Sequence, residues 1–379
     1  MFIEQKIWNK QQGWHTVGNG KLDTPAQIVF VFGDIELVQN TDILSDISKS
    51  YPDSQIVGCS TAGEIVEETV LDQTVVVTAV SFEHTSIRTV CMDIESMSDS
   101  MVMGERLAQA LPVDGLSHVF VLSNGLNVNG SALARGLANR LPRNVAVTGG
   151  LAGDRDNFKN TVVIFDANVR SKGIIVVGFY GTKLKLGYGS MGGWSSFGID
   201  RVVTRSEGNV LYELDGQNAL DLYKMYLGDM ASGLPATGLL FPLSIRIDNG
   251  KSHLVRTIMG INESDGSLTF AGDIPQGSYV RLMKAGLEQL VEGASGAANI
   301  CSQTMGTIPE FAILISCVGR KLVMKQRIEE EVEAIREQFG EKIPVTGFYS
   351  YGEICPAVVH QKQCEFHNQT MTITAFSEK

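Results

Sequence analysis

The chain has 379 residues, of which 44% are apolar and 19% are charged, and its formal net charge is -11. This length predicts two or three domains, and this composition excludes a disordered chain because it supplies enough apolar material for sizeable cores. An acidic excess without a dense run of lysine or arginine argues against a nucleic-acid partner.

Both the apolar runs and the N-terminal segment indicate a cytoplasmic protein. No apolar run is long enough to span a bilayer, so we expect no membrane span. The N-terminal segment, MFIEQKIWNKQQGWH, lacks the apolar stretch and the cleavage site of a signal peptide. The cysteines form no CxxC pair, which favours reduced, buried thiols over a zinc or redox site. They are Cys59, Cys91, Cys301, Cys317, Cys355 and Cys364.

Three similar segments follow one another along the chain. Each begins with an apolar run that predicts a buried strand. These runs are IVFVFGD (28–34), HVFVLSNG (118–125) and AILISCVGR (312–320). A candidate amphipathic helix follows each run, over 40–50, 131–140 and 325–339. Because strand–helix–strand units use right-handed crossovers, we expect mostly parallel strands.

Each predicted helix leads to a second apolar strand that ends in glycines. The first and third of these ends share one frame, in which Gly58 and Glu64 match Gly347 and Glu353. The middle copy has Asp154 in place of the glutamate. One more strand then follows each end: 71–83 and 367–379 match almost residue for residue, and 158–168 is a looser third copy.

The stretch between the second and third copies is different. It contains a glycine-rich segment at 187–198, a helical segment at 217–230 and short runs with turn signals at 241–281 that predict antiparallel hairpins. We therefore expect an α/β fold of repeated strand–helix–strand units with a mostly parallel sheet and a hairpin-rich C-terminal insertion.

At these residues the chain resembles the FIST family of sensory proteins. The matching segments are GCSTAGEI (58–65), GGLAGD (149–154), ELDGQNALDLY (213–223), RTIMGINESDGSLTFAGDIPQGSYVRLM (256–283), GFYSYGEICP (347–356) and HNQTMTITAFSE (367–378). The resemblance implies an N-terminal extension (1–27), a FIST N-terminal domain (28–215) and a FIST C-terminal domain (216–379).

The resemblance also implies a sensor rather than an enzyme. Such a protein binds a small-molecule or gas ligand and signals to a separate partner, and a homodimer is one arrangement consistent with that role. Some family members bind haem and sense nitric oxide beside a histidine kinase or a cyclic-di-GMP enzyme. Others are proposed to bind metabolites such as amino acids, without haem.

The glycine turns are the first candidate ligand site. Glycines at strand ends let a ligand approach the backbone, so we place the ligand in a cleft between the two halves of the chain. The residues expected there are Gly58, Cys59, Ser60, Glu64, Gly347, Tyr349 and Glu353. Two alternatives stay open: a duplicated structural turn capped by its glutamate, and an enzyme that uses Cys59 or Glu64.

A haem sensor needs an axial ligand, which is usually an imidazole. The histidines are His15, His84, His118, His253, His360 and His367. We expect His367 to bind the iron, with His253 next, and a thiolate from Cys355 as a further alternative. Tyr351 is expected beside the haem. For a ligand with a carboxylate or propionate, candidate partners are Arg246, Arg256 and Arg281, and candidate apolar walls include Trp194 and Phe197.

Overall fold

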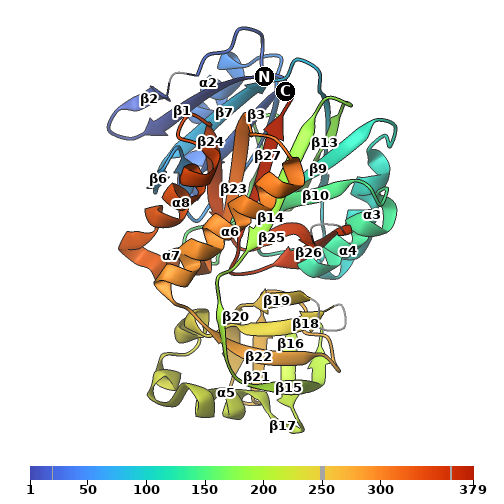
Figure 1. Cartoon of the computed structure of the whole chain (residues 1–379), viewed down its shortest axis with the longest axis vertical. Helices are drawn as coiled ribbons and strands as arrows, with labels where there is room; N and C mark the ends of the chain where they lie inside the picture. The colour runs from blue at the N-terminus through green and yellow to red at the C-terminus, as the bar shows by residue number, and fades with distance from the viewer. Residues whose placement is uncertain (19, 248–251, 359–360) are drawn as a thin grey trace.

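The computed structural model describes residues 1–18, 20–247, 252–358 and 361–379, and it comprises an α/β core and an antiparallel half-barrel (Figure 1). The core is built from residues 1–191 and 287–379, and the half-barrel from residues 195–284. The two chain ends lie close together in the core, at the end far from the half-barrel (Figure 1). None of the helices in the described ranges is long and apolar enough to cross a lipid bilayer.

Each predicted strand–helix–strand segment forms one parallel pair of strands. These pairs are β3 (Ile28–Gly33) with β4 (Gln55–Ser60), β9 (Leu116–Ser123) with β10 (Ala146–Leu151), and β23 (Phe311–Cys317) with β24 (Val345–Ser350). The first strand of each pair has an antiparallel neighbour on its other side: β7 (Val75–Ser81), β13 (Gly173–Tyr180) and β27 (Met371–Ser377), respectively. The three strand triplets are named unit one, unit two and unit three.

Helices connect the parallel strands and cover the sheets. The connecting helices are α1 (Ile35–Val38) and α2 (Thr41–Ser50), α4 (Gly130–Arg140), and α7 (Val318–Met324) and α8 (Glu329–Phe339). Helices α3 (Ser100–Ala110) and α6 (Leu287–Met305) precede units two and three. Asn40 caps α2 by accepting a hydrogen bond from the backbone N–H of Asp42, and Ile43, Leu44 and Ile47 form its buried face.

Short hairpins are exchanged between the units. The hairpin of β5 (Glu64–Val66) and β6 (Thr69–Leu71) leaves unit one and pairs with β24. The hairpin of β25 (Glu353–Val358) and β26 (Gln361–His367) leaves unit three and pairs with β10. The hairpin of β11 (Val163–Phe165) and β12 (Asn168–Arg170) leaves unit two and pairs with β4. Each unit therefore completes the sheet of another unit, and the exchanges close into a ring.

Opposite the exchanged hairpins, the three sheets end in the edge strands β2 (Gly13–Val17), β8 (Ser86–Asp93) and β14 (Lys185–Met191), and β1 (Phe2–Asn9) lies between β2 and β7. Short 3-10 helices in the described ranges are η1 (Met97–Asp99), η2 (Gly228–Gly233), η3 (Ala236–Leu240) and η5 (Lys325–Arg327).

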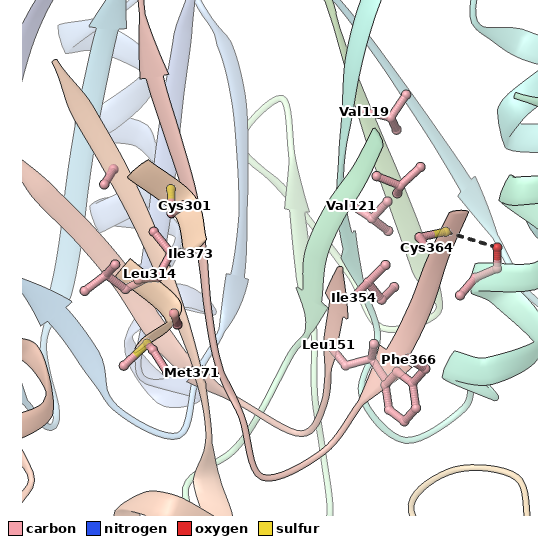
Figure 2. Close-up of a cluster of buried hydrophobic side chains, with 14 of the residues drawn as sticks. Val119, Val121, Leu151, Cys301, Leu314, Ile354, Cys364, Phe366, Met371 and Ile373 are labelled. Atoms are coloured by element: carbon pink, nitrogen blue, oxygen red, sulfur yellow. Dashed lines mark hydrogen bonds between the residues drawn. The ribbon is translucent and has the colours of Figure 1, made fainter. Parts of the chain in front are cut away.

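The three sheets share one buried core on their inner faces. Phe30 of unit one lies there with its ring centroid 5.8 Å from that of Phe120 in unit two and 6.4 Å from that of Phe311 in unit three. The alternate residues face the helices: those of units two and three form a second buried cluster, which includes Val121 and Leu314 (Figure 2), and those of unit one form a separate cluster with α2. Strands in all three sheets are thus buried on both faces.

The expectation of a mostly parallel sheet is wrong. The chain is 42% strand and 27% helix, and the parallel pairs inside the units are the only parallel ladders among the described strands. Continuous apolar runs are typical of parallel strands, which are usually buried on both faces. Here antiparallel strands are enclosed in the same way, because the shared core covers one face and helices cover the other. Residues 158–168 are also not the third strand of unit two; they contribute to the exchanged hairpin, and β13 takes that place.

The half-barrel is one curled antiparallel sheet, in the region where turn signals predicted hairpins. Its strands are β15 (Ser195–Glu207), β16 (Val210–Leu214), β17 (Gln217–Asn218), β18 (Leu243–Ile247), β19 (Ser252–Arg256), β20 (Ile258–Asn262), β21 (Ser267–Phe270) and β22 (Tyr279–Lys284). Helix α5 (Ala219–Leu227) packs on the apolar side of the sheet, against alternate residues such as Leu243 and Leu282. The chain enters the half-barrel from β14 and leaves it into α6 (Figure 1).

Candidate functional site

The three glycine-rich turns lie side by side in the core. The backbone N–H of Ala62 donates to the carbonyl of Tyr349, and the N–H of Tyr349 donates to the carbonyl of Gly63, both at 2.8 Å. The N–H of Gly153, in the middle turn, donates to the carbonyl of Ser60 at 2.9 Å. The exchange of hairpins brings the turns together, because β5 and β25 begin directly at their turns and β11 follows the middle one.

The turns are packed against one another rather than open. The side chains expected to bind ligand there are each at most 1% exposed: Cys59, Ser60, Glu64, Tyr349 and Glu353. A Cβ atom on Gly58 would lie 2.0 Å from the carbonyl oxygen of Val31, and one on Gly347 would lie 1.9 Å from that of Leu314. These glycines therefore allow close approach of the neighbouring strand, and their role toward a ligand stays a prediction.

Glu64 and Glu353 hold the two matching turns through the same hydrogen bonds. Each carboxylate accepts the hydroxyl of the residue three positions earlier, and both the N–H and the hydroxyl of a threonine just before the next core strand. The donors are Thr61 and Thr74 for Glu64, and Ser350 and Thr370 for Glu353. Burial raises the pKa of both carboxyl groups to about 8, against the lowering effect of these hydrogen bonds. This geometry supports the structural-turn alternative.

Cys59 lacks the surroundings of a catalytic nucleophile. Its side chain is fully buried, and burial, followed by the nearby carboxylate of Glu64, raises the pKa of the thiol well above its ordinary value. Reactive thiolates are partly exposed and lie beside positive charge. The geometry therefore gives no support to an enzyme built on Cys59 or Glu64.

The three residues expected at the haem that lie in the core, His367, Cys355 and Tyr351, are buried among other protein groups. His367 is 6% exposed, its Nε2 lies 3.0 Å from the carbonyl oxygen of Cys355, and burial lowers the pKa of its imidazole to about 4. Cys355 is fully buried. The Tyr351 hydroxyl donates to the Asp154 carboxylate and accepts the backbone N–H of Phe158 at 3.1 Å. None of these side chains faces open space, and across the described ranges no group of three or more His, Cys, Asp and Glu side chains is arranged to hold a metal ion.

The remaining expected haem ligand, His253, is exposed and lines a pocket of about 380 Å³ on the half-barrel. The pocket lies beside the crossover from β14 to β15, which contributes Gly192, Gly193 and Trp194. Its charged and aromatic walls are Trp194, Asp200, Arg246, His253, Tyr279 and Arg281. His360 lies outside the described residues.

Strand register places the polar side chains of the pocket on one face. Ser244 of β18 pairs with Arg281 of β22, and Arg246 of β18 pairs with His253 of β19. Because strand side chains alternate between faces, these four side chains point to the same side, and the intervening Ile245 points into the half-barrel core.

Asp200 lies between the two arginines of the pocket. Its Oδ1 accepts a hydrogen bond from Arg281 Nε at 2.6 Å, and its Oδ2 accepts one from Arg246 Nη2. Arg281 is the main cause that lowers the pKa of the Asp200 carboxyl. The Arg246 guanidinium also lies 5.3 Å from the Tyr279 ring centroid. With two arginines against one aspartate, the pocket is positively charged in a chain whose net charge is -11.

Arg320 joins the pocket to the core. Its side chain is fully buried; Nη1 donates to the carbonyl of Gly192, and Nη2 donates to the carbonyl of Leu290 at 2.8 Å. Nε donates to Glu331 at 2.9 Å, and Glu331 accepts the Tyr349 hydroxyl at 2.7 Å. The Arg320 guanidinium therefore contacts the segment that enters the half-barrel and helix α6, which follows the half-barrel. Through Glu331 it is also connected to the glycine turn that contains Tyr349.

Comparison with known families agrees with this architecture. The FIST N domain model matches residues 27–217, and the FIST C domain model matches residues 219–356. The chain belongs to the FIST family. It is 23% identical to the uncharacterized protein MJ1623 of Methanocaldococcus jannaschii, over 97% of this chain and 77% of that protein. It is 22% identical to the uncharacterized protein Rv0628c of Mycobacterium tuberculosis, over 93% of this chain and 91% of that protein. FIST domains are sensory domains that bind small ligands.

In this FIST chain the sequence pointed to part of the pocket. Arg246, Arg281 and Trp194 were singled out separately, and only the fold shows that they meet. Asp200 and Tyr279 were missed. The available signal was the alternation of polar and apolar residues along the predicted hairpins, which marks one polar face.

Arg256 has a different role from the other two candidate arginines. It is 3% exposed and donates to the backbone carbonyls of Asp273 and Phe366, at 3.1 and 2.9 Å. Phe366 belongs to β26 in the core, so Arg256 attaches the half-barrel to the exchanged hairpin instead of facing the pocket.

Proposed function

We propose that this FIST protein is a sensor that binds a small charged metabolite in the half-barrel pocket and signals to a separate protein. The observation that supports this proposal is the position of the pocket. Its wall includes Gly192, Gly193 and Trp194, which connect the half-barrel to the core, and Arg320 holds the Gly192 carbonyl. A ligand at this wall would favour one of two arrangements of half-barrel and core, and a partner would recognise that arrangement.

Haem fits the described side chains poorly. A haem sensor needs an axial ligand that faces an apolar slot. His367 and Cys355 are buried and contact other protein groups. His253 is exposed, but it shares its strand face with the ion pairs of Arg246 and Arg281. We therefore favour a metabolite over haem and nitric oxide and derive no step through haem.

The identity of the partner rests on the family resemblance alone. A histidine kinase or a cyclic-di-GMP enzyme is the partner class that the resemblance implies. The buried network from Gly192 to Tyr349 indicates which part of the molecule would change, because it joins the pocket wall to unit three.

A thermal-shift screen of small metabolites tests the proposal. A ligand that binds the folded protein raises its Tm, and a ligand of this pocket should lose that effect in Arg246→Gln and Trp194→Ala. Arg205→Gln is the matched control, because Arg205 is an exposed, ion-paired arginine of β15 that does not line the pocket. Hits that raise the Tm of every variant equally would place the site elsewhere. Hemin belongs in the same screen, and a Soret band lost in His253→Ala would overturn our preference for a metabolite.

A further inference from the structure

Strand β15 has a bulge where it passes the arginines of the pocket. Its register with β22 breaks between Phe197 and Arg201, so residues 198–200 stand opposite Arg281 alone. Gly198 adopts a left-handed conformation with φ of 78°, which starts the bulge. Bulges next to binding sites typically redirect one side chain out of the regular ladder.

The side chain redirected by this bulge is that of Asp200. It presents one carboxylate oxygen to Arg246 and the other to Arg281, which is how two arginines would hold the carboxylate of a bound molecule. All three side chains stay accessible, with exposures of 29% for Asp200, 35% for Arg246 and 39% for Arg281. Accessible ion pairs contribute little to stability, so another carboxylate can replace Asp200 at small cost.

We propose that Asp200 is an internal substitute for the carboxylate of the ligand, and that the ligand is a small organic carboxylate that displaces it. This inference rests on the proposed function, since it names the ligand class of the same pocket. The arginines would bind the carboxylate of the ligand, and the aromatic rings of Trp194 and Tyr279 would contact its apolar body. Once the ligand displaces it from the arginines, the Asp200 side chain no longer holds the bulge in place. The bulge begins at Gly198, a few residues after Trp194 of the crossover.

Trp194 provides a direct readout of the pocket. The chain has three tryptophans, and Trp8 and Trp14 lie in the N-terminal strands of the core. Replacing those two with phenylalanine leaves Trp194 as the single reporter. Its fluorescence is then followed while benzoate, phenylacetate, succinate or inorganic phosphate is added to the protein, and to its Asp200→Asn, Arg281→Gln and Arg205→Gln variants.

We expect at least one carboxylate probe to change Trp194 fluorescence and to bind Asp200→Asn about fivefold more tightly, because the neutral amide competes poorly for the arginines. Arg281→Gln should abolish the response and Arg205→Gln should leave it unchanged. If the carboxylate probes bind the Asp200→Asn variant equally or more weakly, the proposal that Asp200 takes the place of the ligand carboxylate is overturned. The aspartate would then be inert or a direct ligand contact. A response to phosphate but to no carboxylate would overturn the ligand class.

The same experiment separates this inference from the proposed function. If hits from the thermal-shift screen depend on Arg246 and Trp194 while Asp200→Asn binds them no more tightly, the pocket is a sensor site and the inference fails alone. If neither probes nor screening hits respond to any pocket variant, both fail.

Discussion

Removing the charge of Glu331 should destabilise the protein more than most single substitutions. Both Glu331 and Arg320 are fully buried, and Glu331→Gln leaves the guanidinium with the neutral carbonyls of Gly192 and Leu290 as its main acceptors. Breaking a buried ion pair from one side typically costs about 3–5 kcal/mol, because an uncompensated charge remains. Arg320→Met should cost a similar amount and should also release both carbonyls that border the half-barrel.

Urea unfolding followed by circular dichroism measures these losses. The double variant Arg320→Met/Glu331→Gln should lose clearly less than the sum of the two single variants, since it leaves no isolated charge. Arg327→Met is the control: its ion pairs with Glu288 and Glu330 lie at the surface, so it should cost clearly less than either buried variant. The reasoning is refuted if Arg320→Met costs no more than Arg327→Met, or if the single losses simply add.

Three further predictions concern the core. Glu353→Gln should gain stability relative to the wild type as the pH rises from 4.5 to 8, by up to about 1.4 kcal/mol per pH unit. The reason is that the wild-type carboxyl ionises more readily in the unfolded chain than in the buried site. A difference in urea midpoints that does not depend on pH would contradict this. Gly347→Ala should cost about 1–3 kcal/mol or prevent folding, because its Cβ would clash with the Leu314 carbonyl, whereas Gly260→Ala, with no atom closer than 3.9 Å, should be nearly neutral; equal Tm values for the two would refute the close-approach argument. The third prediction concerns His367, whose pKa is lowered from 6.5 to about 4. The wild type should lose stability as the pH falls through that range, because only the imidazole of the unfolded chain takes up a proton. His367→Gln should remove this dependence, and an unchanged pH profile would show that the imidazole is not buried in its neutral form.

Local features of the fold could be predicted from sequence wherever neighbouring residues decide them. The apolar stripe of Ile43, Leu44 and Ile47 predicted a helix over 40–50, and α2 spans Thr41–Ser50 with Asn40 as its cap, because amphipathicity and capping act within a few turns of one helix. The matching Gly-Glu-Ile frames also predicted a structural alternative for Glu64 and Glu353, and their identical hydrogen bonds support it.

Pairing between distant segments could not be predicted in this way. The exchanged hairpins bring β5 to β24 and β25 to β10, and nothing in a three-residue strand such as β5 specifies a partner far away in the chain. The direction of the strands was also hidden, because strands buried on both faces have the same apolar pattern whether their neighbours are parallel or antiparallel.

The sequence by itself therefore determined the family, the amphipathic helices α2, α4 and α8 and the residues of the glycine turns, since each depends on a contiguous motif. Only the tertiary structure decided which candidates meet. It enclosed the glycine turns and His367 in the core, and it gathered Asp200, Arg246 and Arg281 from three strands into one exposed pocket. The physical reason is that burial and charge pairing depend on long-range strand register, which no local pattern encodes.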